Sequence, residues 1–165
     1  MKRVALSALA ALALSAADAR AEPEIISSSE RSWDVLSSEY PPIRHAALIC
    51  HYPPQTDNYF CLAIGCRAAG QMEPYVLNVG GDPFPENAYA FTVDGTPIAA
   101  VRSTNVGQDD SHTHVGAIGP SAMDSLIDAL SAGSKVIVTY NTFRVRFPLR
   151  GFSAALSEVK RACAG

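Results

Sequence analysis

The sequence carries little charge, and it contains no long apolar run after its first 17 residues. Charged residues make up 18% of the 165 positions, below the usual quarter, and the net charge is −3. A net negative charge argues against a nucleic-acid-binding protein, which normally carries a clustered basic excess. The lack of a later apolar run of about 18 residues argues against a membrane-spanning body. With 48% hydrophobic residues, the chain is predicted to fold as one globular domain.

Motifs for catalysis and cofactor binding are also lacking. No Gly-x-Ser-x-Gly sequence is present, and Gly80-Gly81 is not followed by the Lys-Ser/Thr of a phosphate-binding loop. Ser111 and His112 are neighbours, but neighbours in a strand face opposite sides of the sheet. We therefore predict no catalytic residue, no cofactor and no enzymatic activity.

The N-terminus has the pattern of an export signal. Lys2 and Arg3 precede the apolar stretch Val4–Ala17, and Ala19-Arg20-Ala21 matches a small-x-small cleavage site. We expect a signal peptide at 1–21, a loose polar segment at 22–42 and a single disulfide-stabilised β-rich domain at 43–165, located in the periplasm or secreted. A retained anchor helix is the alternative for the first segment.

Four cysteines remain after the predicted cleavage site, and in an exported chain an even number indicates two disulfides. Zinc sites use closely spaced cysteine pairs that this sequence does not have. Three pairings are possible for Cys50, Cys61, Cys66 and Cys163. A hairpin centred on Gln55-Thr56 would set Cys50 opposite Cys61 and leave Cys66 for Cys163, and this is the pairing that we favour.

Short strands separated by turn residues make up most of the expected domain. Asp94-Gly95 supplies the positive φ angles of a tight hairpin turn. Pro97 places its strand at an edge or at a strand start. The lone Trp33 is expected to be a packing anchor. Strands are predicted at 46–51, 59–66, 75–79, 88–93, 96–102, 111–117, 135–140 and 143–147.

Two short helices are predicted in the C-terminal third. Ser121 is the expected cap of the first, and Gly133 is its expected left-handed stop. The second begins near Gly151 and has an apolar stripe that ends at Cys163. The predicted fold is therefore mainly β with two helices (α+β), with an antiparallel β-sandwich or barrel-like core, because the βαβ order of a parallel sheet is absent.

The C-terminal part resembles a known family. An amphipathic helix leads to Leu130-Ser131-Ala132-Gly133, a hairpin follows, and the chain continues as Leu149-Arg150-Gly151-Phe152-Ser153-Ala154-Ala155-Leu156. This succession is similar to the invasion-associated locus B family of exported proteobacterial proteins. The resemblance implies a β-sandwich-like core, paired cysteines, a periplasmic or surface location and a part in host-cell interaction. It supplies no catalytic residues.

His112 and His114 are the candidate metal ligands. Residues two apart in a strand share a face, so both imidazoles would point at one ion, with Asp109 and Asp110 as added oxygen ligands. The alternative is a solvated strand end.

Arg144, Arg146 and Arg150 are the candidate binding residues, because the first two share a strand face on an acidic protein. Such a stripe would contact a protein or an anionic envelope component. The alternative is that these arginines are ordinary solvated or ion-paired residues of the sheet. The leading prediction is a non-enzymatic exported binding or structural module. The alternatives are an inhibitor or immunity-type protein, working through a loop such as Pro53-Pro54, and a metal-binding module.

Overall fold

The fold is described from a computed structural model over residues 24–37, 43–54, 57–67, 70–79, 88–106, 111–140 and 143–164. The predicted signal peptide lies outside these residues. The strands and helices, in chain order, are β1 (Ile25–Ser27), β2 (Asp34–Ser37), β3 (His45–His51), β4 (Tyr59–Cys66), β5 (Met72–Val79), β6 (Ala88–Val93), β7 (Thr96–Asn105), β8 (Ser111–Ala117), α1 (Pro120–Ala132), β9 (Lys135–Tyr140), β10 (Phe143–Pro148) and α2 (Phe152–Cys163).

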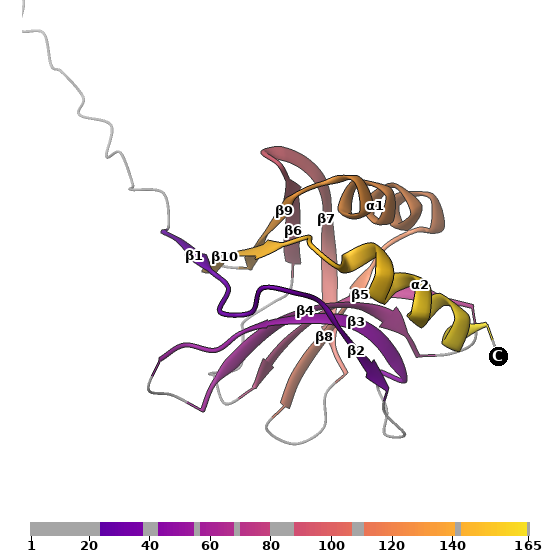
Figure 1. Cartoon of the computed structure of the whole chain (residues 1–165), viewed down its shortest axis with the longest axis horizontal. Helices are drawn as coiled ribbons and strands as arrows, with labels where there is room; N and C mark the ends of the chain where they lie inside the picture. The colour runs from indigo at the N-terminus through magenta and orange to yellow at the C-terminus, as the bar shows by residue number, and fades with distance from the viewer. Residues whose placement is uncertain are drawn as a thin grey trace, which may run out of the picture.

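The strands form one curled sheet in the order β1-β10-β9-β6-β7-β8-β5-β4-β3-β2 (Figure 1). All neighbours are antiparallel except β1 and β10, which are parallel. The predicted mainly β fold with a barrel-like core and two C-terminal helices is confirmed. The expectation of a purely antiparallel sheet needs one correction, at the β1 edge.

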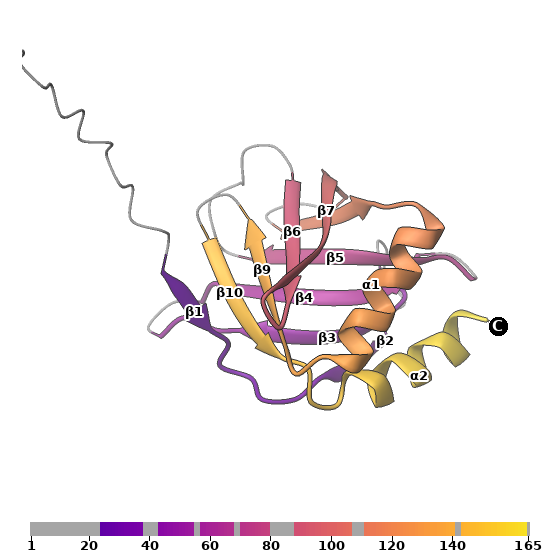
Figure 2. The same ribbon diagram turned by 90° about the horizontal axis from the view of Figure 1, so that it is seen from above.

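The sheet bends at strand β7, which changes its pairing along its length. Its residues 96–102 pair with β6, whereas Arg102–Asn105 pair with β8. A register irregularity between Phe91 and Thr92 of β6 accompanies Pro97 at the start of β7, where only β6 is its partner. As a result, the strands β6, β9 and β10 cross over β3, β4 and β5, which Figure 2 shows from above.

The concave side of the sheet holds the main core, and both helices close it on the side away from β1 (Figures 1 and 2). Strand alternation turns every second side chain inward. Helix α1 buries the face that holds Leu126 and Leu130, and α2 buries Phe152, Leu156 and Val159. No helix among the described residues is long and apolar enough to cross a membrane.

The N-terminal segment was expected to be loose, but the described residues 24–37 are tied to the sheet. Because β1 and β2 are consecutive in sequence and lie at opposite edges of the sheet, the residues between them bridge those edges (Figure 1). Ser28 N–H donates to the Arg146 carbonyl at 2.8 Å, and Trp33 Nε1 donates to the Pro148 carbonyl at 2.8 Å. We call residues 28–33 the strap. As predicted, Trp33 is a buried packing anchor, with its ring 4.8 Å from that of Phe152.

The predicted turn at Asp94-Gly95 is confirmed. Asp94 has φ 48° and Gly95 has φ 88°, the two left-handed residues of a tight hairpin between Val93 and Thr96. The Asp94 carboxylate accepts hydrogen bonds from the Ser134 N–H and hydroxyl groups, at 2.9 and 2.6 Å. The turn is thereby joined to the loop after α1.

Both predicted boundary signals of the first helix were wrong. The N-cap is Gly119 with Pro120 following it, and Ser121 lies inside the first turn. Gly133 is not left-handed but extended, with φ −82° and ψ 171°. Glycine is needed there for space, because a Cβ would collide with Val93 Cγ1. A left-handed glycine does stand at the start of the second helix, where Gly151 has φ 89° directly before α2.

Candidate functional site

Two disulfides hold opposite ends of β4. Cys50 is bonded to Cys61 in the β3–β4 hairpin, and Cys66 is bonded to Cys163 at the end of α2. These are the pairs that the hairpin argument favours. Cys50 and Cys61 are direct cross-strand partners with a Cα–Cα distance of 4.1 Å. Such a short spacing is typical of a non-hydrogen-bonded pair, in which the side chains approach most closely.

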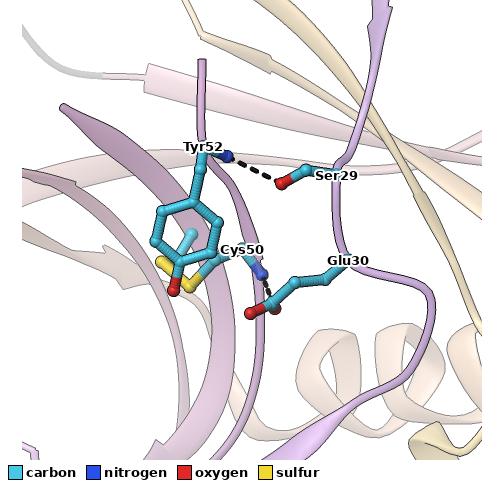
Figure 3. The surroundings of a disulfide bond; sticks show 5 residues. Ser29, Glu30, Cys50 and Tyr52 are labelled. Atoms are coloured by element: carbon cyan, nitrogen blue, oxygen red, sulfur yellow. Dashed lines mark hydrogen bonds between the residues drawn. A yellow bond between two sulfur atoms is a disulfide. The ribbon is translucent and has the colours of Figure 1, made fainter. Parts of the chain in front are cut away.

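The strap supplies the hydrogen bonds that β4 does not give to this end of β3 (Figure 3). Cys50 N–H donates to the Glu30 carboxylate at 2.5 Å, and the Cys50 carbonyl accepts from Glu30 N–H at 3.3 Å. Two residues further on, Tyr52 N–H donates to the Ser29 hydroxyl at 2.9 Å. The edge of β3 is therefore covered up to the point where the hairpin enters its turn.

An aromatic pair lies at the end of the hairpin, next to the disulfide. The register that pairs Cys50 with Cys61 continues to place Tyr52 across from Tyr59, and their ring centroids are 5.7 Å apart at 44°. Tyr52 is 49% exposed. Since side chains two apart share a face, both rings stand on the same face as the disulfide. We call Tyr52, Tyr59 and the exposed Pro54 the hairpin tip.

The convex side of this sheet, to which the tip belongs, is apolar beyond the disulfide. A second cluster of buried residues lies there, separate from the main core: Ile43, Ala46, Ala63, Tyr75 and Val115. Leu36, Leu48 and Leu77 pack against it and are only partly buried. The tip therefore lies at one end of the sheet face that carries this second cluster.

The surroundings of the tip are acidic. Burial and the negative charge of Glu30 raise the pKa of the Tyr52 phenol above its ordinary value, with smaller contributions from Tyr59 and Asp34. The sequence of the β3–β4 hairpin, from Ala46 to Cys66, contains one acidic residue, Asp57, and neither lysine nor arginine.

Of the two predicted metal ligands, only His114 has a side chain that the structure describes. His112 and His114 share a strand, but the position of the His112 side chain lies outside what the structure describes, as do Asp109 and Asp110. His114 is buried, at 4% exposure. Among the described residues, no group of three or more histidine, cysteine or acidic side chains is placed to hold a metal ion.

His114 instead joins a buried polar cluster between three strands. Its Nδ1 lies 3.3 Å from the Tyr140 hydroxyl of β9 and 3.4 Å from the Ser103 hydroxyl of β7. Burial raises the pKa of Tyr140. Because all three side chains are buried, we interpret the cluster as hydrogen bonding within the core.

The three candidate arginines are divided between two places. Arg144 and Arg146 stand on the outward side of β10, where β1 pairs with them through Ile25 and Ser27 and leaves them only partly exposed. Arg150 is exposed in the turn before α2. Strand β1, which was not predicted, thus occupies the edge beside the proposed stripe.

A buried carboxylate that the sequence reasoning missed lies at the other end of the β4–β5 pair. Arg67 donates two hydrogen bonds to Glu73, at 2.8 and 2.7 Å, and the Tyr75 hydroxyl donates a third at 2.7 Å. Burial alone would raise the pKa of Glu73, but the bonds from Arg67 and Tyr75 outweigh it and lower that pKa. The same burial raises the pKa of Tyr75. We interpret this group as a structural ion pair.

A pattern in the sequence would have revealed the hairpin tip. Cys50-x-Tyr52 is mirrored by Tyr59-x-Cys61, so any hairpin that pairs the cysteines also pairs the tyrosines on the same face. No comparable signal marks Ser29 and Glu30, whose contacts depend on the path of the strap.

Comparison with known proteins gives no relative to compare this site with. The chain matches no protein-family model, no curated protein and no solved structure.

Proposed function

We propose that the protein is an exported, non-enzymatic module that binds another protein through the hairpin tip. The observation that carries the proposal is the pair of the exposed Tyr52 and the half-buried Tyr59 beside the Cys50–Cys61 disulfide. Tyrosine is enriched where proteins meet, since its ring gives a large contact area and its hydroxyl a hydrogen bond. An aromatic pair that is partly open to solvent therefore supports a binding role.

Rigidity strengthens this interpretation. The tip is fixed by the disulfide and by the hydrogen bonds that Cys50 and Tyr52 make to the strap. A loop that is already in its bound conformation loses little conformational entropy on binding. Hairpin tips without such restraints would lose more, so the restraints favour affinity.

The export part of the proposal has two supports. Two disulfides within one chain suit an oxidising compartment, and the N-terminal 21 residues have the pattern of a signal peptide. The similarity of the C-terminal part to exported invasion-associated locus B proteins is in keeping with this location. We place the contact at the tip and not at Arg144 and Arg146, because these arginines lie beside β1 and are only partly exposed.

An inhibitor of a secreted or cell-wall enzyme is the second candidate. The β3–β4 hairpin extends on the side of the molecule away from the helices, and Pro53-Pro54 stiffens its turn (Figures 1 and 2). A stiff, protruding loop is the form that fits an enzyme cleft. Inhibition of purified cell-wall hydrolases by the protein, lost in a Tyr52→Ala variant, would distinguish an inhibitor from a module that binds without inhibiting.

The test of the main proposal is site-specific photocrosslinking in the native host. A benzophenone amino acid is placed at Tyr52 or, as a control on the opposite side, at the exposed Ser157 of α2. We expect a discrete crosslinked species from position 52 and none from position 157. The species should disappear when Tyr59→Ala is added, provided that the variant keeps its melting temperature. Equal crosslinking from both positions, or none from position 52, would contradict the proposal.

A further inference from the structure

We propose that the hairpin tip takes a basic side chain of its protein partner, a lysine or an arginine, on the faces of Tyr52 and Tyr59. This inference rests on the proposed function and adds the chemistry of the partner. It follows from the position of the two rings, the sign of the charge around them and the absence of lysine and arginine in the strands that carry them.

The charge around the tip is negative in the described residues. The negative charges of Glu30 and Asp34 both act on the Tyr52 hydroxyl, whereas Glu24 and the arginines of β10 belong to the β1 edge. Asp57 adds a third carboxylate, exposed in the hairpin itself. A group of this composition attracts a cation and repels an anionic lipid or glycan.

Asp34 lies on the same face as the tyrosines. It pairs directly with Leu48 of β3, and Leu48, Cys50 and Tyr52 alternate onto one side of that strand. A carboxylate from β2 and an aromatic pair from the hairpin thus border one surface. The Glu30 carboxylate, held by the Cys50 N–H, lies between the strap and this end of β3 (Figure 3).

The tyrosines supply the second half of the recognition. A cation within about 6 Å of a ring centroid is attracted by the negative face of the ring, and two rings 5.7 Å apart border a single position. An arginine adds stacking of its planar guanidinium, and both basic side chains have an apolar stem that would lie along Leu48. An aliphatic or acidic side chain would use only part of these contacts.

The experiment is an NMR titration of the full disulfide-bonded protein, with its six tyrosines labelled in the ring. Two probes are compared, acetyl-Gly-Arg-Gly-amide and the matched neutral peptide in which citrulline replaces arginine. We expect the arginine peptide to shift the Tyr52 and Tyr59 ring signals in a saturable way. The shifts should weaken when salt is raised from about 0.05 to 0.5 M, because screening shortens the reach of the carboxylates. The citrulline peptide should bind several-fold more weakly.

Three variants separate the contributions. Tyr52→Leu keeps an apolar side chain but removes one ring face, and should weaken arginine binding about two- to five-fold. Asp34→Asn should weaken it and reduce its dependence on salt. Asp124→Asn, an exposed carboxylate on α1 far from the tip, is the matched control and should change nothing.

The outcomes distinguish this inference from the proposed function. Equal binding of the arginine and citrulline peptides, or no shift of the two rings with either, overturns the basic-side-chain proposal. In that case, crosslinking from position 52 would still support a protein contact of another chemistry. Ring shifts that depend on protein concentration alone would show that a second copy of the chain binds at the tip. That result would also overturn the basic-side-chain proposal.

Discussion

The two disulfides close loops of very different length, and this difference predicts unequal losses of stability. The Cys50–Cys61 bond spans 11 residues and the Cys66–Cys163 bond spans 97. In the chain-entropy description, the shorter loop contributes about 3 kcal/mol and the longer about 4–5 kcal/mol to the free energy of unfolding. We therefore expect the pair variant Cys66→Ala/Cys163→Ala to be less stable than Cys50→Ala/Cys61→Ala by about 2 kcal/mol.

Packing makes the two variants a fair comparison. All four cysteines are at most 4% exposed, so each pair of substitutions removes similar buried volume. Helix α2 remains anchored by Phe152, Leu156 and Val159. Its last turn also keeps the hydrogen bond from Gly70 N–H to the Cys163 carbonyl, at 2.8 Å. We therefore expect the loss of stability to arise mainly from the greater conformational freedom of the unfolded chain. The helix content of the folded protein, measured by circular dichroism, should change little.

The assay is urea unfolding followed by the fluorescence of the single tryptophan. Trp33 is buried against Phe152, where the strap, β10 and α2 meet, so its emission reports on all three. With a urea slope of about 2 kcal/mol/M, the two variants should differ in midpoint by about 1 M. Equal midpoints, or a lower midpoint for the hairpin pair, would refute the loop-length argument.

Three further substitutions test the turn, the sheet and the strap. Asp94→Asn should be destabilising at pH 7, since hydrogen bonds from Ser134 lower the pKa of the Asp94 carboxyl. In a pH series of melting temperatures, the difference from wild type should shrink as the pH falls below about 4, where the unfolded chain is protonated first, and disappear once the folded carboxylate is protonated too. Gly133→Ala should cost about 1–3 kcal/mol in urea unfolding, because its Cβ would collide with Val93; a neutral result would contradict the close approach. Trp33→Phe should lower the free energy of unfolding by about 1 kcal/mol or more through the lost Nε1 hydrogen bond, whereas a loss below about 0.3 kcal/mol would show that this bond matters little.

Local patterns were enough to predict most of the strands. The bounds of β4, β6, β8 and β9 agree with the sequence prediction, because each is a short apolar or alternating run bordered by turn residues. The Asp94-Gly95 turn follows from the one backbone geometry that suits this dipeptide. The apolar stripe of α2, from Phe152 to Cys163, follows from helical spacing in the same way.

Features that depend on distant contacts escaped prediction. Strand β1 has three residues and pairs in parallel with β10, more than 100 positions away, so nothing in its own sequence marks it. Gly133 has the sequence context of a left-handed helix stop, but its role is set by Val93 of β6, the strand beside β9. Likewise, the start of β5 at Met72 was expected to be loop, although pairing with Cys66 extends the strand.

The candidate site depends on the same register as the first disulfide. Pairing Cys50 with Cys61 sets Tyr52 beside Tyr59, and the backbone groups of β3 that face away from β4 then meet the strap. If β3 slipped by one residue against β4, Tyr52 would turn to the concave side, away from Tyr59, and the cysteine pair would be broken. The bond that stabilises the hairpin therefore also fixes which side chains its end presents. For this reason, we expect substitutions that allow the β3–β4 hairpin to change its register to abolish binding at the tip, even where the rest of the curled sheet stays folded.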